Sequence, residues 1–485
     1  MQLTKEQKQI VDSVKNLDSH LVINAYAGTG KTTTLVAVAE SYPQYKFLYL
    51  AYNRSVKEEA EARFPSNVKV LTTHGLGYKW YVTNVGSPRL GYNLRPYTIC
   101  ELYDIDYKSA YYAIKIFHEY CNSVNRDMHT IAKHMSYKVP SERDYINIGR
   151  EAALRLWQDM IDRKIEITHD FYLKLASESD CSELLSGYDF VLLDEAQDTN
   201  PVVFKILLNS GKPIIAVGDV HQKIYGFRNA MDVMSKLYNE YDAKMLYLTE
   251  SFRFPQEVAD LAYQWLCLKP DFDEELYPPL KGQGPKDPKI ETYAYITRTN
   301  AEIVDKIAKM DPNSDFYSYR TPSEIFALPM AIAERFFMYT PPIKLPDNLR
   351  KFVSKFYSLG ELSRYALDAN DIEVSASIDI VKMYHKRLTD LYKLLRSKNR
   401  KKKGLCILTA HTSKGLEFGT VKMADDWEWN IKPGTQQEIE EYNLIYVAMT
   451  RSIHTMYPNN IVKDRLNLKE TFCISKKAIS IDEVF

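Results

Sequence analysis

A lysine and a threonine follow a glycine-bearing turn near the start of the chain, in the segment AYAGTGKT at residues 25–32. Backbone N–H groups of such a turn, and of the N-terminus of a following helix, can surround the oxygens of a phosphate. In loops of this kind the lysine, here Lys31, reaches the β- and γ-phosphates, and the hydroxyl of Thr32 binds Mg²⁺. The spacing therefore indicates a phosphate-binding loop for a nucleoside triphosphate, although Ala25 replaces the usual first glycine. An accidental Gly-Thr-Gly turn is the alternative.

Two adjacent carboxylates supply a second element of the same chemistry. Asp194 and Glu195 follow the apolar run FVLL, which places both at the edge of a predicted strand. Asp194 is expected to hold Mg²⁺, and Glu195 to orient and deprotonate the attacking water. An Asp-Glu pair after a strand is commonplace by itself, and it becomes specific only together with the Lys31 loop.

Short apolar runs that end abruptly in polar residues must position these groups. We predict buried parallel strands, since each run is continuously apolar. In doubly wound sheets ligands bind beyond the carboxyl ends of the strands, where this chain places Asn, Thr, His, Asp and Glu. The first set comprises LVIN (21–24), FLYLAYN (47–53), VKVLTTH (68–74), FVLLDEAQ (190–197) and PIIAVGD (213–219). A second set, which predicts a second α/β lobe, comprises KMLYLTESFR (244–253), AYITRTN (294–300) and LCILTAHTSKGLEF (405–418), with a helix at 440–451.

Two long segments lack this strand-end chemistry and are predicted to be inserted helical domains. One is the Tyr-rich stretch between His74 and Thr168, and the other covers residues from about 305 to 400. The second closes with the basic run RSKNRKKK at 396–403. A run of this kind is most simply a solvated linker, and phosphate contact is the less favoured interpretation.

Length, charge and cysteine content restrict the class of protein. The 485 residues are too many for one core, and the formal net charge is zero. A nucleic-acid-binding chain of this composition would have to concentrate Lys and Arg on one face. Six scattered cysteines without a C-x-x-C pair argue against a zinc module or a disulfide framework. Without an apolar run of about 18 residues or a signal peptide, we expect a soluble protein in the cytoplasm of a bacterial or phage-infected cell, or associated with the nucleoid.

The ordered set of motifs resembles superfamily 1 helicases of the UvrD, Rep and PcrA type, and AYAGTGKT and ITHDFYLKL resemble the F-box DNA helicase branch. The resemblance implies that Gln7 reads the adenine edge, that Phe252 stacks on the base, and that Glu417 binds the ribose. It implies a catalytic set of Lys31, Glu195, Gln222, Arg253 and Arg451, in which Gln222 senses the γ-phosphate and the arginines contact it. The full ATP set is Gln7, Ala27, Gly28, Thr29, Gly30, Lys31, Thr32, Thr33, Phe252, Arg253, Gly415, Glu417 and Arg451, with Thr32 and Asp194 on Mg²⁺.

A sequence-tolerant track for single-stranded DNA needs aromatic platforms and polar groups directed at the backbone. The candidates are Tyr52, Thr73, His74, Tyr225, Phe227, Arg228 and His411, of which the set from 225 to 228 rests on the resemblance. In a chain with 36 Tyr and 19 Phe, a single aromatic residue is more often core or surface filler. The two histidines lie within matched motifs, which favours a functional role for them.

The resemblance implies an α/β fold of two RecA-like parallel-sheet lobes, each with an inserted, mainly helical domain. The first lobe is predicted at 1–80 and 166–255, its insertion at 81–165, the second lobe at 256–304 and 404–485, and a reduced second insertion with the basic linker at 305–403. No F-box precedes Gln7, so we expect no ligase-adaptor role.

The predicted function is an ATP- and Mg²⁺-dependent 3′–5′ DNA helicase or translocase, serving DNA repair, recombination or replication. Its partner would be single-stranded DNA or a duplex with a single-stranded tail, without membrane; a protein partner is possible, and the sequence does not identify it. The short second insertion keeps open a nucleic-acid-stimulated ATPase that remodels protein–DNA complexes or acts as a sensor without processive unwinding. A P-loop phosphotransferase ranks lowest, because it would have no use for Arg451 or for the GDVHQKIYGFR segment.

Overall fold

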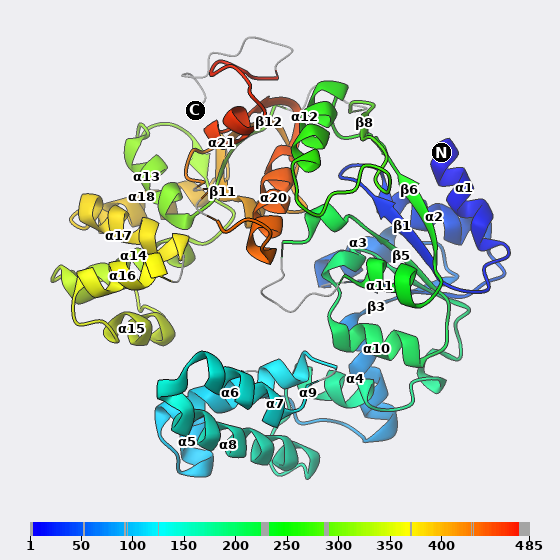
Figure 1. The fold of residues 1–485 in the computed structure, drawn as a ribbon, viewed down its shortest axis with the longest axis horizontal. Coiled ribbons are helices and arrows are strands. Elements are labelled where there is room, and N and C mark those ends of the chain that lie inside the picture. The colour runs from blue at the N-terminus through cyan, green and yellow to red at the C-terminus, as the bar shows by residue number, and fades with distance from the viewer. Residues whose placement is uncertain are drawn as a thin grey trace. The chain divides into compact units, whose positions relative to one another are not determined.

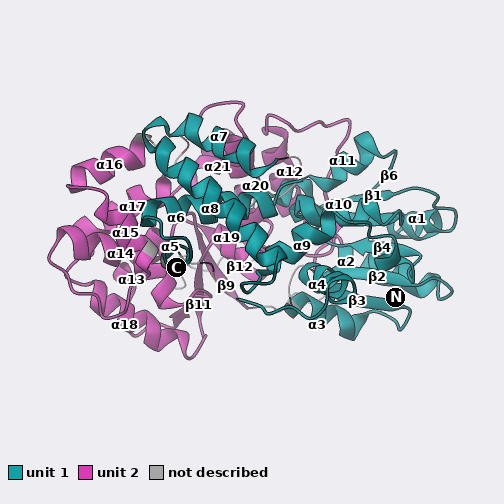
Figure 2. Ribbon diagram, turned by 90° about the horizontal axis from the view of Figure 1, so that it is seen from below, with its two compact units in different colours: residues 1–26, 30–248 teal, residues 27–29, 249–485 magenta. Residues whose placement is uncertain are grey.

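The computed structural model describes residues 3–51, 54–91, 94, 96–124, 126–224, 232–285, 291–368, 371–427, 429 and 431–474. The chain divides into two compact units, residues 1–26 with 30–248 and residues 27–29 with 249–485 (Figure 2). The division falls within the phosphate loop and directly after the strand that ends at Leu248. Each unit is built on its own parallel sheet.

The first unit contains a six-stranded parallel sheet in the order β3-β2-β4-β5-β1-β6 (Figure 1). Its strands are β1 (Leu21–Ala25), β2 (Phe47–Ala51), β3 (Val68–Thr72), β4 (Phe190–Leu193), β5 (Ile214–Gly218) and β6 (Lys244–Leu248). The first five confirm the predicted strand set. The sixth was grouped with the second set of runs, although the predicted bounds of the first lobe, 166–255, include it; it pairs with β1 at the edge of the first sheet.

Alternate side chains of these strands enter two separate cores, as expected for a sheet covered on both faces. Phe47 and Tyr49 face a core shared with α1 (Lys5–Val14), α2 (Lys31–Ser41) and α3 (Arg54–Arg63). Leu48 and Leu50 face a second core with α4 (Thr73–Asn84), α9 (His169–Ser177), α10 (Pro201–Asn209) and α11 (Val233–Glu240). Carboxyl ends of the strands are thereby left for the functional residues.

A helical group extends the second core of the first unit. It consists of α5 (Pro96–Tyr103), α6 (Tyr107–Cys121), α7 (Met128–Lys138) and α8 (Arg143–Ile161), drawn in cyan to teal in Figure 1. Gly149 allows α8 to lie close to α6, because a Cβ there would be only 2.8 Å from the carbonyl oxygen of Ser109. The group continues the core through buried side chains such as Ile116 and Leu156.

The second unit contains a five-stranded parallel sheet in the order β10-β11-β9-β12-β13. Its strands are β9 (Tyr293–Thr297), β10 (Phe316–Tyr317), β11 (Leu405–Thr409), β12 (Phe418–Met423) and β13 (Ser452–Tyr457); β7 (Glu250–Ser251) pairs separately with β8 (Lys281–Gly282). The further helices are α12 (Gln256–Cys267), α13 (Asn300–Lys309), α19 (Ala410–Ser413), α20 (Gln436–Met449) and α21 (Asn460–Arg465). Both sheets are parallel, so the predicted α/β class with two parallel-sheet lobes is confirmed.

A second helical group lies between β10 and β11 in the sequence. It comprises α14 (Pro322–Phe336), α15 (Asp347–Ser354), α16 (Leu359–Asp368), α17 (Ile372–Tyr384) and α18 (Leu388–Asn399). The predicted start of this insertion at residue 305 falls inside α13, which packs against the sheet, and β10 pairs with β11. The group therefore begins at α14, because residues 300–317 contribute a helix and a strand to the lobe itself.

The cysteines form no disulfide in this structure, and all six are free thiols. Among the helices in the described part of the chain, none has the length and apolar character needed to cross a membrane.

Candidate functional site

The phosphate loop joins β1 to α2, and two glycines give it its shape. Gly28 and Gly30 have φ values of +75° and +82°, a left-handed conformation that glycine adopts without steric cost. Gly30 is the N-cap of α2, so Lys31 opens the helix and free N–H groups of the first turn line the loop. Thr33, also predicted in the ATP set, accepts a hydrogen bond from Arg63 Nη2 at 3.2 Å.

The predicted magnesium ligands lie next to each other in the first unit. Thr32 Oγ1 donates a hydrogen bond to Asp194 Oδ2 at 2.7 Å. Tyr49 Oη donates to the same oxygen at 3.0 Å, a contact that the sequence did not reveal. Burial, with repulsion from Glu195, raises the pKa of Asp194 above its ordinary value. A hydroxyl and a buried carboxylate are the hard oxygen donors that suit Mg²⁺, so the residues present fit this cation.

Glu195 occupies an unusual backbone conformation directly after Asp194. Its φ and ψ are 50° and 43°, a left-handed geometry that costs a non-glycine residue about 1–3 kcal/mol and persists where the surroundings enforce it. Its Oε1 lies 3.6 Å from Lys31 Nζ, and its Oε2 accepts a hydrogen bond from Gln197 Nε2 at 2.5 Å. The carboxylate is thus oriented from two sides, although its side chain is 41% exposed.

A chain of hydrogen bonds extends from Glu195 to Gln222. Gln197 Oε1 accepts from the backbone N–H of Asp219 at 3.1 Å, and Gln222 Nε2 donates to Asp219 Oδ2 at 2.7 Å. A Cβ on Gly218 would overlap the Gln197 amide, so glycine at that position leaves room for it. Burial raises the pKa of Asp219. Gln197 and Asp219 were not among the predicted site residues, although both follow strands whose polar ends were recognised.

Gln7 lies beside the loop and also caps its own helix. Its Oε1 accepts from Thr4 N at 3.1 Å, while Thr4 Oγ1 accepts from Gln7 N at 3.1 Å, which completes a capping box on α1. A Cβ on Gly30 would be 3.2 Å from Gln7 Nε2. The amide nitrogen thus faces the loop while the oxygen serves the cap.

The second unit gathers the predicted arginines. Arg253 Nη2 and Nε lie 2.6 and 2.8 Å from Glu417 Oε1, and Arg253 Nη1 donates to the carbonyl of Thr450 at 3.0 Å. Arg451 is 1% exposed and donates to the carbonyls of Val447 and Leu416. The two arginines are therefore neighbours at the start of β13.

Loop residues 27–29 group with these arginines in the second unit. The N–H of Ala27 donates to Tyr446 Oη at 3.2 Å, and the N–H of Phe252 donates to the carbonyl of Gly28 at 2.9 Å. A Cβ on Gly28 would be 2.5 Å from the Cβ of Arg253, so only glycine allows this approach. Thr29 is buried, and Gly415 has a φ of +86°.

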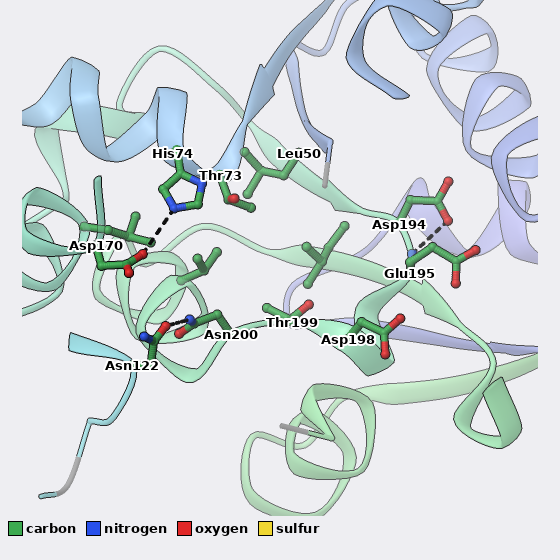
Figure 3. Close-up of a pocket in the computed structure, with 13 residues that line it drawn as sticks. Leu50, Thr73, His74, Asn122, Asp170, Asp194, Glu195, Asp198, Thr199 and Asn200 are labelled. Carbon is green, nitrogen blue, oxygen red and sulfur yellow. Dashed lines mark hydrogen bonds and ion pairs between the residues drawn. The ribbon is translucent and has the colours of Figure 1, made fainter. Parts of the chain in front are cut away.

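A cavity of about 420 Å³ in the first unit holds the predicted DNA-contacting residues Thr73 and His74 (Figure 3). Asp194 and Glu195 lie on one side of it, and His74 with Asp170 on the other. His74 Nε2 is 3.5 Å from Asp170 Oδ1, and His118 Nδ1 is 3.4 Å from Asp170 Oδ2. Hydrogen bonds from the two histidines hold the pKa of Asp170 well below its ordinary value.

Asp170, His118 and Asn122 were missed because α9 and the helical group supply them. Asn200, the N-cap of α10, donates to Asn122 at the end of α6. Only ITHDFYLKL gave a signal for this region, and nothing in the sequence of α6 marked its histidine or asparagine.

His74 and His411 occupy equivalent places in their two units. Each follows a strand that ends in a threonine whose hydroxyl caps the next helix: Thr72 accepts from Gly75 N, and Thr409 from Thr412 N. Each histidine is the second residue after its cap. Of the other predicted DNA contacts, Tyr52, Tyr225, Phe227 and Arg228 lie outside the described residues.

Known proteins match the chain along nearly its whole length. Residues 108–242 match the model for the UvrD/REP helicase N-terminal domain, and residues 1–81 match that for the type III restriction enzyme res subunit. F-box DNA helicase protein 1 of Schizosaccharomyces pombe is 30% identical over 95% of this chain and 58% of its own length. F-box DNA helicase 1 of Gallus gallus is 28% identical over 93% and 48%. A putative ATP-dependent DNA helicase, YjcD, of Bacillus subtilis is 24% identical over 92% and 77%.

The chain spans about half the length of the two F-box relatives. The matched region nevertheless includes the phosphate loop, both carboxylates and the arginines, since it covers more than nine-tenths of this chain. With two parallel sheets and these ordered motifs, the chain is UvrD-like and similar to superfamily 1 helicases.

Proposed function

We propose that this protein is an ATP-dependent DNA motor that moves 3′ to 5′ on single-stranded DNA and opens duplex. The observation that carries the ATPase part is the constellation of Lys31, Thr32, Asp194 and Glu195 around one loop. The DNA part is supported by the UvrD-like match and by the printed names of the helicase relatives. Polarity and a role in repair, recombination or replication rest on the resemblance of the motifs.

The first-unit residues have distinct tasks in this proposal. The Lys31 ammonium binds phosphate oxygens, and the helix N-terminus adds N–H donors. Thr32 and Asp194 hold Mg²⁺, which when bound neutralises phosphate charge. Glu195 takes the proton of the attacking water, since Gln197 and Lys31 hold its carboxylate in place while leaving it open to solvent.

Hydrogen bonds connect Glu195 through Gln197 and Asp219 to Gln222. This chain of contacts would link ATP hydrolysis to the bound DNA strand. Gln222 is assigned to the γ-phosphate, and the DNA contacts Tyr225 and Phe227 follow it in the sequence. A change in phosphate occupancy that moves Gln222 would pull on Asp219 through a 2.7 Å hydrogen bond. Arg253 and Arg451 would stabilise the charge of the transferring phosphoryl group. Gln7 and Phe252 would select the nucleoside, whereas Glu417, which the motif resemblance assigns to the ribose, is paired with Arg253.

A second candidate is an ATPase that remodels protein–DNA complexes or senses nucleic acid without net unwinding. The limited size of the helical group α14–α18 within residues 322–399 favours it, because strand separation needs surfaces beyond those that move along a strand. The two candidates share one ATP site and differ only in what happens to a duplex.

One experiment tests the function directly. ATP hydrolysis is measured with and without single-stranded DNA, followed by displacement from 3′-tailed and 5′-tailed duplexes. Stimulated hydrolysis with displacement from 3′ tails alone is expected; stimulation without displacement would select the remodeller, and displacement from 5′ tails would overturn the polarity. An equal rate of ATP hydrolysis with and without DNA would contradict the proposal of a DNA motor.

A separate variant tests the role of Glu195 as the general base. Glu195→Gln should keep ATP binding and lower turnover by about 10²–10⁴-fold, the usual contribution of a general base. Glu183→Gln, an exposed glutamate on the 3₁₀ turn Glu183–Leu185, is the matched control. Unchanged turnover in Glu195→Gln would remove Glu195 from this role.

A further inference from the structure

A strongly basic segment of the second unit has no part in the roles above. Residues 393–403 contain seven Lys or Arg and no acidic residue, in a chain whose 63 cationic and 63 acidic residues balance. Six of the seven are exposed: Lys393, Arg396, Arg400, Lys401, Lys402 and Lys403. Local charge density of this kind in a neutral chain is the pattern that a polyanion-binding surface requires.

The segment is folded, so the backbone that carries its charges has a fixed position. Lys393, Arg396 and Arg400 follow the helical spacing of three and four residues and lie on one face of α18 and its end. Asn399 Oδ1 accepts from Ser318 N at 2.8 Å, and Lys398 Nζ donates to the carbonyl of Ser314 at 2.6 Å. The sequence alone favoured a solvated linker, whereas the structure attaches this run to β10.

Several cations remain available to a ligand. Lys403 pairs with Asp315 at 3.1 Å. Among the described residues, none forms an ion pair with the side chains of Arg396, Arg400 or Lys401. In the described part of the chain, no carboxylate within ion-pair distance therefore has to be displaced from these three side chains before a ligand binds, although the pKa of Asp315 is lowered first by the hydrogen bond from Lys403 and also by the field of Lys401.

Helix stabilisation does not account for the whole segment. Cations in the last turn of a helix interact favourably with its dipole, which covers Arg396 and Lys398. Lys401, Lys402 and Lys403 follow the end of α18, where the dipole effect declines. Arg396 and Arg400 are four residues apart, a like-charge spacing that destabilises a helix. This like-charge repulsion opposes the favourable dipole interaction, and an anionic ligand would relieve it.

An aromatic side chain accompanies the charges. Tyr319 is 47% exposed, and Lys402 Nζ lies 5.8 Å from the centre of its ring. Exposed aromatic rings beside cations are what nucleic-acid surfaces use to contact bases while binding the backbone.

The position of the segment separates it from the predicted strand track. It leads into Leu405 at the beginning of β11, whereas His411 follows the end of that strand. Five residues of strand separate the two ends by roughly 15 Å. A nucleic acid that contacts both must extend beyond the motif residues.

We propose that residues 393–403, with Tyr319, form a second nucleic-acid surface that binds the phosphodiester backbone outside the motif track. The proposal rests on the proposed DNA motor. A regular array of phosphates suits this segment better than a receptor that binds an extended basic peptide does, because the backbone that carries the cations is a folded helix end and turn. Duplex and single strand offer the same phosphate chemistry, and the experiment below distinguishes them.

The test compares two triple variants of the full chain. R396Q/R400Q/K401Q removes three exposed charges from the surface. K46Q/K69Q/K244Q removes three exposed charges from the amino-terminal side of the first sheet, where they are dispersed, and serves as the control. Binding of a blunt duplex and of a single strand is measured by fluorescence anisotropy between 50 and 200 mM salt, with melting curves to confirm folding.

Loss of three phosphate contacts lowers the salt slope by about 2.7 for a duplex and about 2.1 for a single strand. Over that fourfold salt range, wild-type affinity for duplex should fall about 40-fold more than that of the surface variant. Lys401→Gln alone should lower the duplex slope by about 0.9. A change for one nucleic acid only identifies that form as the ligand.

Two results would contradict the proposed nucleic-acid surface. One is an unchanged salt dependence of binding in the surface variant, and the other is an equal loss of salt dependence in both triple variants. A failure of the proposed DNA motor would give a different result. If wild-type hydrolysis ignored single-stranded DNA, the proposed function would fail, while salt-dependent binding would still decide for or against the surface.

Discussion

Lys31 in the first unit and Arg253 in the second have the same exposure but are held differently. Each side chain is 12% exposed, and their partner carboxylates, Glu195 and Glu417, are 41% and 47% exposed. Lys31 Nζ is 3.6 Å from Glu195, whereas Arg253 makes two contacts of 2.6 and 2.8 Å with Glu417. The lysine pairs loosely, so a phosphate can take over with little loss. Arg253, by contrast, must break its charge-assisted hydrogen bonds to Glu417, or share them with the phosphate, when it binds a phosphate.

The charged groups of the two units are therefore held in different ways before a nucleotide binds. In the first, Thr32 and Asp194 are already in contact and Glu195 is oriented by Gln197. In the second, Arg253 and Arg451 satisfy their guanidinium groups with protein oxygens. Removing a side chain from the preformed set of the first unit should therefore abolish function. In the second unit, where the arginines are already paired, changing a partner residue should alter how the arginine acts.

The largest effect is expected from the first unit. Lys31→Ala removes the ammonium from the phosphate loop and should lower ATP turnover by at least about 10³-fold, because electrostatic stabilisation of transferring charge is a large term. Phosphate release and calorimetric ATP binding measure it. Lys57→Ala, which changes a half-buried lysine paired with Glu61 on α3, is the control. Robust hydrolysis in Lys31→Ala would remove the loop from the site.

A smaller loss of turnover is expected for the second unit's arginine. Arg253→Lys keeps the charge but loses the planar fork that reaches both Glu417 and Thr450, so turnover should fall about 10²–10³-fold with ATP affinity nearly unchanged. Steady-state kinetics separate the two parameters.

Arg350→Lys, which alters the exposed pair of Arg350 with Glu334 on α14, controls for the loss of a guanidinium. Wild-type turnover in Arg253→Lys would show that this arginine only packs against Glu417. A parallel loss of ATP affinity would mean that it binds the ground state as well.

The phosphate loop could be predicted from the sequence because its geometry is local. Gly28, Gly30 and Lys31 lie within four residues, and a strand and a helix of ordinary pattern flank them. The carboxylates were recognised for the same reason. Pairing between Arg253 and Glu417 was not, although both were named as site residues, because 164 positions separate them.

The contacts of the helical group and the pairing of β6 could not be predicted from the sequence. His118 reaches Asp170 only because α6 packs against α9, a contact that depends on tertiary structure. The run that forms β6 was grouped with the second set although the predicted lobe bounds placed it in the first, because a short apolar run does not reveal its neighbour. Tyr49 reads as a buried strand residue, and only the register of β2 against β4 brings its hydroxyl to Asp194.

An intermediate effect is expected where the loop approaches Arg253. Gly28→Ala places a methyl group 2.5 Å from the Arg253 Cβ and from Ser251 Oγ, on a backbone with a φ of +75°. The conformation alone costs about 1–2 kcal/mol. We expect about tenfold weaker turnover together with a lower melting temperature.

Gly211→Ala separates backbone strain from crowding. Gly211 has a φ of +65°, and an added Cβ would meet nothing within 4 Å. It should cost the conformational term alone and leave turnover unchanged. If Gly28→Ala and Gly211→Ala lose equal stability and equal activity, the close contact between Gly28 and Arg253 does not contribute to turnover.

The smallest effect should come from the partner of the arginine. Glu417→Gln keeps a hydrogen-bond acceptor for Arg253 Nε but removes the opposing charge from a partly exposed pair, an interaction worth at most about 1 kcal/mol. Arg253 then becomes more available to phosphate, so KM for ATP should fall by up to about fivefold, less at high salt. Glu334→Gln, which leaves Arg350 without its carboxylate, should change neither parameter. An increase in KM would instead assign Glu417 to the ribose, and the tight pairing of Arg253 would then be a packing contact rather than a reserve of charge.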